Sequence, residues 1–189
     1  MPLIVSVMGT SHDEFRRLVD GVASRDEVAA LELNISCPNV KSGLVVGESP
    51  EETFSLLEAL RPNCDKPLIV KLTPNVPPAR LAEAAEGGGA DAVSLINTLR
   101  AAAPVGAGSG GLSGPAVRAI ALLHVREVAG AVSIPVVGMG GVASGVHAAE
   151  LIRAGATVVA VGTESFRDPA AGRRVARELS DLLHPVPAA

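Results

Sequence analysis

The residues from Leu31 to Val40 combine an apolar run with a polar loop that holds one thiol between two carboxamides. Cys37 supplies the thiol, and Asn34 and Asn39 lie on either side of it. A cysteine in such a loop can act as a base or as a nucleophile once it is ionised. Each carboxamide can donate and accept hydrogen bonds, so the pair suits a planar ligand with amide and carboxylate groups. The segment predicts an active site at the end of a strand.

Two glycine-rich motifs follow later apolar runs of the chain. Gly138-Met139-Gly140-Gly141 follows one run, and Gly162-Thr163 follows the next. Backbone N–H groups of closely spaced glycines can point at one anion. Either motif alone could simply form a tight turn. Because the two motifs end consecutive predicted strands, phosphate binding is the favoured interpretation.

The elements that position these residues alternate along the chain. Apolar runs predict six buried strands, at 3–7, 31–35, 68–72, 92–96, 135–138 and 158–161. Helical spacing predicts six helices, at 13–23, 50–60, 78–87, 115–128, 145–153 and 169–183. Ser49-Pro50 and Asp168-Pro169 are typical helix starts, and the glycines at 87–89 and 155 are expected to end helices in a left-handed conformation. Residues 99–109, rich in alanine and glycine, are expected to be a connection.

Strand followed by helix, six times over, predicts an α/β fold with a parallel sheet. A doubly wound sheet and a (β/α)8 TIM barrel both fit. The glycine loops favour the barrel, because barrels commonly bind phosphate with the loops after their last two strands. These would be strands seven and eight, so the chain would contain strands 3 to 8. We therefore expect residues 1–189 to form a single partial TIM-barrel domain that lacks its first two β/α units, at the N-terminal side.

The composition narrows the possible partners and compartment. Aromatic residues make up 2% of the chain and the net charge is -4, which argues against a nucleic acid or an acidic membrane surface as partner. The sequence contains neither an apolar run of membrane-spanning length nor a signal peptide. Cys37 and Cys64 are expected to be reduced thiols, and no metal site is expected from the spacing of cysteine and histidine. These features favour a cytoplasmic protein.

Six motifs give the chain a specific resemblance to a known family. They are NISCPNV at 34–40, VKL at 70–72, INT at 96–98, GGLSGP at 110–115, GMGGV at 138–142 and VGT at 161–163. Their order and spacing resemble those of class 1 dihydroorotate dehydrogenases, the FMN-dependent TIM barrels of pyrimidine biosynthesis. The cysteine at position 37 resembles class 1, because class 2 relatives carry a serine at that position. The sequences around Asn97-Thr98 and from Gly110 to Gly114 are most similar to those of the NAD-linked subclass B.

The resemblance implies a reaction and roles for individual residues. The reaction is oxidation of (S)-dihydroorotate to orotate by hydride transfer to FMN, with Cys37 as the catalytic base. An ordinary thiol is mostly protonated at neutral pH, so Cys37 would need activation by its surroundings. The resemblance assigns substrate binding to four residues with carboxamide or hydroxyl groups: Asn34, Asn39, Asn97 and Thr98.

FMN binding is likewise implied for residues spread over the whole chain. These residues are Ser6, Asn34, Lys71, Ile96, Gly114, Gly140, Gly141, Gly162 and Thr163. Lys71 is implied to face N1 and O2 of the flavin, where a fixed cation stabilises the reduced ring. Considered alone, Lys71 could also lie at the barrel rim or form a Schiff base. Ile96 and Gly114 are implied to contact the flavin through their backbones.

Subclass B members pair the FMN barrel with a second subunit that carries FAD and a [2Fe-2S] cluster. The resemblance therefore implies a possible homodimer and an iron–sulfur flavoprotein partner, with either NAD through that partner or fumarate as electron acceptor. Two alternatives stay open. One is a flavoprotein similar to dihydropyrimidine dehydrogenase, whose substrates lack the carboxylate, although Asn39 after Pro38 favours orotate. The other is a catalytically silent barrel fragment.

Overall fold

Six parallel strands form one curled sheet in the computed structural model, which describes residues 2–36, 46–103 and 108–184. The strand order is β1-β2-β3-β4-β7-β8, so each strand pairs with the next sheet strand along the chain. Their bounds are Leu3–Val7, Val28–Asn34, Leu68–Lys71, Ala92–Leu95, Val136–Met139 and Val158–Ala160. This is the arrangement of a partial (β/α)8 barrel, as the sequence predicts.

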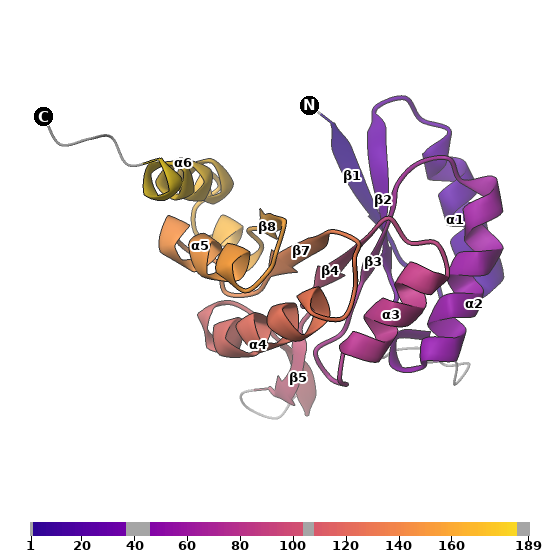
Figure 1. Cartoon of the computed structure of the whole chain (residues 1–189), viewed down its shortest axis with the longest axis horizontal. Helices are drawn as coiled ribbons and strands as arrows, with labels where there is room; N and C mark the ends of the chain where they lie inside the picture. Colours follow the sequence, from indigo (N-terminus) through magenta and orange to yellow (C-terminus); the bar gives the residue numbers. More distant parts are fainter. Residues whose placement is uncertain (1, 37–45, 104–107, 185–189) are drawn as a thin grey trace, which may run out of the picture.

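Helices cover the convex side of the sheet, from α1 and α2 at one end to α5 and α6 at the other (Figure 1). Their bounds are α1 His12–Ala23, α2 Pro50–Leu60, α3 Ala79–Gly87, α4 Arg118–Ala129, α5 Gly145–Arg153 and α6 Ala171–Leu183. Short 3₁₀ turns occupy Val46–Glu48, Arg61–Asn63, Pro115–Val117 and Thr163–Phe166. Among the helices that the structure describes, none is long and apolar enough to cross a membrane.

The two faces of the sheet have different cores. Outward-facing side chains such as Leu33, Leu68 and Val93 are fully buried against the helices and belong to the main hydrophobic core. On the concave face a smaller cluster brings together Ala30, Ile69 and Ala92. Successive side chains of a strand point to opposite faces, so each strand contributes to both cores. This explains why the strands appear in the sequence as nearly continuous apolar runs.

Local signals set most helix ends as predicted. Ser49 caps α2 by accepting a hydrogen bond from the Glu52 N–H group at 3.2 Å, with Pro50 in the first turn. Gly89 and Gly155 have φ angles of 98° and 111°, in the left-handed region expected after a helix. β2 begins at Val28, three residues before the predicted strand.

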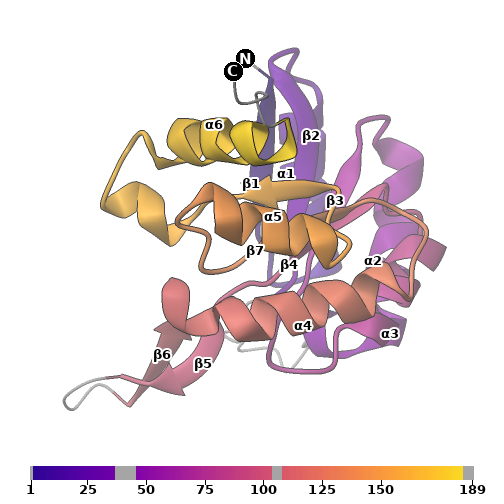
Figure 2. The same cartoon turned by 60° about the vertical axis from the view of Figure 1, so that its left-hand side comes forward.

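Three predicted boundaries or connections are wrong. The last helix, α6, begins at Ala171, two residues after the predicted start at Pro169, and the Asp168 carboxylate accepts from the Ala170 N–H group and pairs with Arg174. The helix predicted at 115–128 opens as a 3₁₀ turn before α4. The connection expected at 99–109 contains an antiparallel hairpin of β5, Leu99–Ala102, and β6, Ser109–Leu112, which projects from the sheet (Figure 2).

Candidate functional site

A cavity of about 650 Å³ opens on the concave face of the sheet. Apolar side chains from the strand interiors, including Ile69 and Val137, form its floor. Polar side chains and glycines at the carboxyl ends of the strands form its upper wall, namely Ser6, Glu32, Lys71, Asn97, Thr98, Ser113, Gly114, Gly140, Gly141, Gly162 and Thr163. Active sites of TIM barrels lie at this end. The volume is within the range of pockets that bind small molecules and cofactors.

One wall of the cavity carries an ion pair. Lys71, the last residue of β3, places its ammonium 3.2 Å from the Glu32 carboxylate on β2. The same carboxylate accepts hydrogen bonds from the hydroxyls of Ser6 on β1 at 2.9 Å and Ser94 on β4 at 2.8 Å. The register places Ser6 opposite Glu32 and Lys71 opposite Ser94. Four adjacent strands thus contribute one polar side chain each to a continuous network.

A second polar cluster joins the ends of β2 and β4. The Asn97 carboxamide donates to the Asn34 side-chain oxygen at 3.1 Å, and the same oxygen accepts from the Ser36 N–H group at 3.3 Å. The Asn97 side-chain oxygen accepts from the Thr98 N–H group at 2.8 Å. The Ser36 hydroxyl donates to the Lys71 carbonyl at 2.7 Å, which ties this cluster to the end of β3. The fold thus brings the predicted residues Asn34, Asn97 and Thr98 together.

Two glycine loops touch at the other end of the cavity. Gly114, Gly140 and Gly141 have φ angles of 82°, 123° and 71°, which side chains other than that of glycine rarely tolerate. A Cβ atom on Gly141 would lie 2.9 Å from the Gly114 carbonyl, so these loops leave no room between them. The Thr163 hydroxyl donates to the Ser113 hydroxyl at 2.9 Å and brings in the loop after β8.

Gly162 differs from these glycines because the space beside it is open. A Cβ atom there would meet nothing within 4 Å, and the residue lines the cavity. Backbone N–H groups of loops with this character can approach a phosphate closely. The cavity thus has a cation and carboxamides at the ends of β2, β3 and β4, and glycine loops after β7 and β8.

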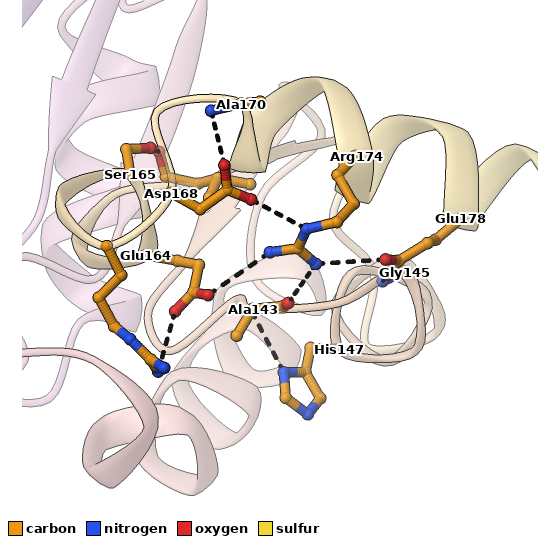
Figure 3. A network of polar contacts seen from close by, with 11 residues as sticks. Ala143, Gly145, His147, Glu164, Ser165, Asp168, Ala170, Arg174 and Glu178 are labelled. Atoms are coloured by element: carbon orange, nitrogen blue, oxygen red, sulfur yellow. Dashed lines mark hydrogen bonds and ion pairs between the residues drawn. The ribbon is translucent and has the colours of Figure 1, made fainter.

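Arg174 of α6 ties the two last loops to each other (Figure 3). Its guanidinium donates to the Ala143 carbonyl at 3.0 Å, in the loop after β7, and lies 3.4 Å from the Glu164 carboxylate, in the turn after β8. It also pairs with Asp168 at 3.0 Å and Glu178 at 3.2 Å.

Hydrogen bonds lower the pKa values of two carboxylates in this network, those of Asp168 and Glu178. Bonds from Arg174 and from the Ala170 N–H group lower the pKa of Asp168. For Glu178, the bond from the Gly145 N–H group, at 2.6 Å, is the main cause of a lowered pKa, followed by the bond from Arg174. The network therefore fixes α6 against both loops with charge-assisted bonds.

Some site residues were absent from the sequence predictions. Glu32 and Ser94 line or adjoin the cavity, and Asn75 joins two loops beside it by accepting from the Arg100 N–H group at 2.8 Å and donating to Thr73 at 2.8 Å. The position of Glu32 two residues before Asn34 in a strand was a usable signal, because such residues share a face. The sequence gives no comparable signal for Ser94 or Asn75.

Cys37 and Asn39, the predicted base and a predicted substrate ligand, lie outside the described residues. The other predicted site residues lie at or beside the cavity. Within residues 2–36, 46–103 and 108–184, no group of three or more histidine, cysteine, aspartate or glutamate side chains is arranged to hold a metal ion.

Comparison with known proteins identifies relatives over the whole chain. The family model described as dihydroorotate dehydrogenase matches residues 1–183. A protein from Geobacter metallireducens, named dihydroorotate dehydrogenase B (NAD(+)), catalytic subunit, is 47% identical over 192 residues, which cover 96% of this chain and 63% of that protein. A protein of the same name from Maridesulfovibrio salexigens is 42% identical over 199 residues, covering 100% and 65%. The chain therefore spans less than two thirds of the length of these relatives.

A solved structure agrees with the fold. The crystal structure of dihydroorotate dehydrogenase from Eimeria tenella, in complex with ferulenol, superposes on 91% of this chain and 54% of that chain, with a TM-score of 0.78 and 24% sequence identity. At that identity the likeness supports a partial (β/α)8 barrel and nothing finer. The family model and the two relatives described above establish the family, and the names of these relatives agree with the predicted similarity to subclass B. The chain belongs to the dihydroorotate dehydrogenase family.

Proposed function

We propose that this chain forms the FMN-binding part of a dihydroorotate dehydrogenase catalytic subunit, which oxidises (S)-dihydroorotate to orotate in pyrimidine biosynthesis. One observation carries the proposal. A single cavity is bordered by the Lys71 cation and the Asn34 and Asn97 carboxamides at the ends of β2, β3 and β4, and by the glycine loops after the next two sheet strands, β7 and β8. This order of groups matches the order of ring system and phosphate along FMN. Family membership supports the choice of substrate.

The roles of the residues follow from the chemistry of the substrate. Oxidation of dihydroorotate removes a proton from C5 and a hydride from C6. We assign the proton to the Cys37 thiolate, and Cys37 follows Ser36 directly in the sequence, three residues after Asn34. FMN, when bound, accepts the hydride. Carboxamides can donate to the substrate carboxylate and accept from its ring N–H groups, which suits Asn34, Asn39 and Asn97.

The partner and the compartment are part of the same proposal. The relatives are named as NAD(+)-linked catalytic subunits. By analogy we propose an electron-transfer subunit that carries FAD and a [2Fe-2S] cluster, a homodimer of the FMN subunit, and a location in the cytoplasm. Gel filtration of the purified protein with and without a co-expressed partner tests the assembly.

Flavin reduction tests the activity. The purified protein is loaded with FMN, freed of excess flavin and mixed without oxygen with dihydroorotate or dihydrouracil. We expect stoichiometric FMN and bleaching of its absorbance by dihydroorotate only. Cys37→Ser should slow bleaching by about 100-fold or more, the usual contribution of a general base, while FMN stays bound. Cys64→Ser is the matched control, because that thiol is 2% exposed in the hydrophobic core.

Three outcomes would contradict the proposal: failure to bind FMN, bleaching by dihydrouracil instead of dihydroorotate, and an unchanged rate in Cys37→Ser. The first outcome would refute FMN as the cofactor, the second would refute dihydroorotate as the substrate, and the third would refute Cys37 as the base. Each part of the proposal can therefore fail separately.

A further inference from the structure

Glu32 places a carboxylate in the wall of a cavity whose floor is apolar. Its side chain is only 12% exposed, and it stands on the concave face of β2, two residues before Asn34. Removing a carboxylate from water is costly unless charged or hydrogen-bonding partners compensate for it. The partners of Glu32 therefore indicate why an acid stands at this position.

Each oxygen of the carboxylate has a partner from another strand. Oε1 accepts from the Ser6 hydroxyl at 2.9 Å and from the Lys71 ammonium at 3.2 Å, and Oε2 accepts from the Ser94 hydroxyl at 2.8 Å. Ser94 is fully buried. The two hydroxyls fix the carboxylate from both sides, so that it forms a rigid acceptor for the ammonium.

A lysine needs such an acceptor more than most side chains do. Lys71 has a flexible four-carbon stem, and its ammonium would otherwise move toward water at the rim of the barrel. Its side chain is 21% exposed, so the rim is within reach. The charge-assisted bond to Glu32 keeps the ammonium on the cavity wall.

We propose that Glu32 is the positioning residue for Lys71, held in turn by Ser6 and Ser94, and that it makes this wall of the cavity a balanced ion pair instead of a bare cation. The electronic part of this inference rests on the proposed function, because it concerns the flavin that Lys71 would face. The positional part concerns the protein alone.

A chemical footprint tests the positional part without flavin. The chain has three lysines, Lys41, Lys66 and Lys71, so acetylation of each by acetic anhydride can be followed by mass spectrometry. An ammonium must leave its carboxylate and lose a proton before the amine attacks. We expect Glu32→Gln to speed acetylation of Lys71 relative to Lys66 by about tenfold, the scale of a lost bond to a charged group. The matched control is Glu58→Gln, on the exposed side of α2.

Ser6→Ala provides a second route if Glu32→Gln lowers the yield of folded protein. It removes one of the two hydroxyls that fix the carboxylate, so it should speed Lys71 acetylation less than Glu32→Gln does. An unchanged Lys71 to Lys66 ratio in both variants would overturn the inference.

The electronic part predicts opposite shifts for the two charges. Removing a negative charge beside the flavin favours the reduced, more negative ring, and removing the cation disfavours it. We expect Glu32→Gln to shift the reduction equilibrium of bound FMN about tenfold toward the reduced form, or ~30 mV, and Lys71→Gln to shift it as far the other way. The double variant, which is neutral like the original pair, should return close to the starting potential.

A residue with a merely structural role would not give shifts of opposite sign that cancel. Shifts in the same direction, or no shift in Glu32→Gln, would overturn the balanced-pair inference. Failure of the unsubstituted protein to bind FMN would instead defeat the proposed function, and the acetylation ratio would still decide whether Glu32 positions Lys71.

Discussion

Gly141 and Gly162 both border the cavity, yet the backbone requires a glycine at only one of them. Gly141 has a φ of 71°, and a Cβ atom on it would lie 2.9 Å from both the Gly114 carbonyl and the Arg118 Cβ atom. Gly162 has a φ of -103°, and the space beside it is open. The first glycine is needed for the fold, and the second leaves room at the cavity.

Alanine substitution should separate these two roles. Gly141→Ala forces a side chain into the left-handed region and into close contacts, so we expect it to lower the free energy of unfolding by about 1 to 3 kcal/mol. Gly162→Ala should change that free energy by less than about 1 kcal/mol but weaken FMN binding, because its methyl group projects into the cavity. Urea unfolding and flavin titration measure the two effects. Equal losses of stability would contradict the distinction.

At the scale of elements, the β5–β6 hairpin is closely packed at its base, where Thr98 directly precedes β5. Half of its strand residues are alanine or glycine, which have low β propensity. A Cβ atom on Gly111 would lie 2.5 Å from the Thr98 hydroxyl oxygen, so β6 packs directly on that residue, whereas a Cβ atom on Gly110 meets nothing within 4 Å. Adjacent glycines of one strand therefore have different surroundings.

Substitution of Gly111 should destabilise the hairpin, whereas substitution of Gly110 should not. Gly111→Ala pushes β6 away from Thr98, and we expect faster amide hydrogen exchange at 99–102 and 109–112, by about fivefold or more if about 1 kcal/mol of local stability is lost. Gly110→Ala is the control and should leave exchange unchanged. Equal protection in the two variants would show that the contact with Thr98 does not hold the hairpin.

The C-terminal helix depends on one arginine. Arg174→Ala removes the bonds of α6 to Ala143, Glu164 and Asp168, and the pair with Glu178 within the helix. The melting temperature should therefore fall relative to Arg173→Ala, which alters an exposed neighbour on the same helix. The pKa values of Asp168 and Glu178 are lowered in the folded protein. Their contribution is therefore present above the unfolded pKa and is lost as the pH falls through the folded one.

Melting at low pH provides a control for the Arg174→Ala prediction. The difference in melting temperature between Arg174→Ala and Arg173→Ala should be constant from pH 7 to about 5. It should narrow once the pH falls below about 4, the ordinary range of these carboxylates in the unfolded chain, and toward their lowered folded pKa values. Circular dichroism melts at pH 7 and pH 3.5 measure it. A difference that is the same at both pH values would rule out the charged network as its cause.

At the scale of the whole molecule, the two faces of the sheet contribute unequally to stability. Leu68 is fully buried between the sheet and the helices. Its neighbour Ile69 faces the other way, packs against Ala30 and Ala92 and lines the cavity. β1 and β8 form the edges of the described sheet, and their residues Ile4 and Val158 are 62% and 53% exposed on the concave side.

Two adjacent substitutions should reveal this difference. Leu68→Ala leaves a cavity in the main core and should cost about 3 to 5 kcal/mol of unfolding free energy, whereas Ile69→Ala should cost about 2 kcal/mol, since its surroundings are already open on one side. Both values come from urea denaturation at constant m-value. A larger loss of unfolding free energy for Ile69→Ala than for Leu68→Ala would show that packing on the concave face contributes more to stability than the main core does.

The sequence by itself determined the order of the elements and the loops that carry chemistry. Strand periodicity, the Ser49 cap and the glycines with positive φ are local features, readable from neighbouring residues. They predicted six parallel strands and located Lys71 and the glycine loops at strand ends. The Asp168-Pro169 pattern predicted the last helix but placed its start two residues too early, and it gave no sign of the bond from Arg174, six positions later.

Only the tertiary structure decided which side chains meet. Glu32 contacts Lys71 and Ser94 across 39 and 62 positions of sequence, and Asn75 accepts from the Arg100 N–H group of the β5–β6 hairpin across 25 positions. No local propensity encodes such contacts, because they depend on the curl and register of the sheet. The motifs at the strand ends indicated the family from sequence alone. The ion pair between Glu32 and Lys71 in the cavity wall became visible only in the folded structure.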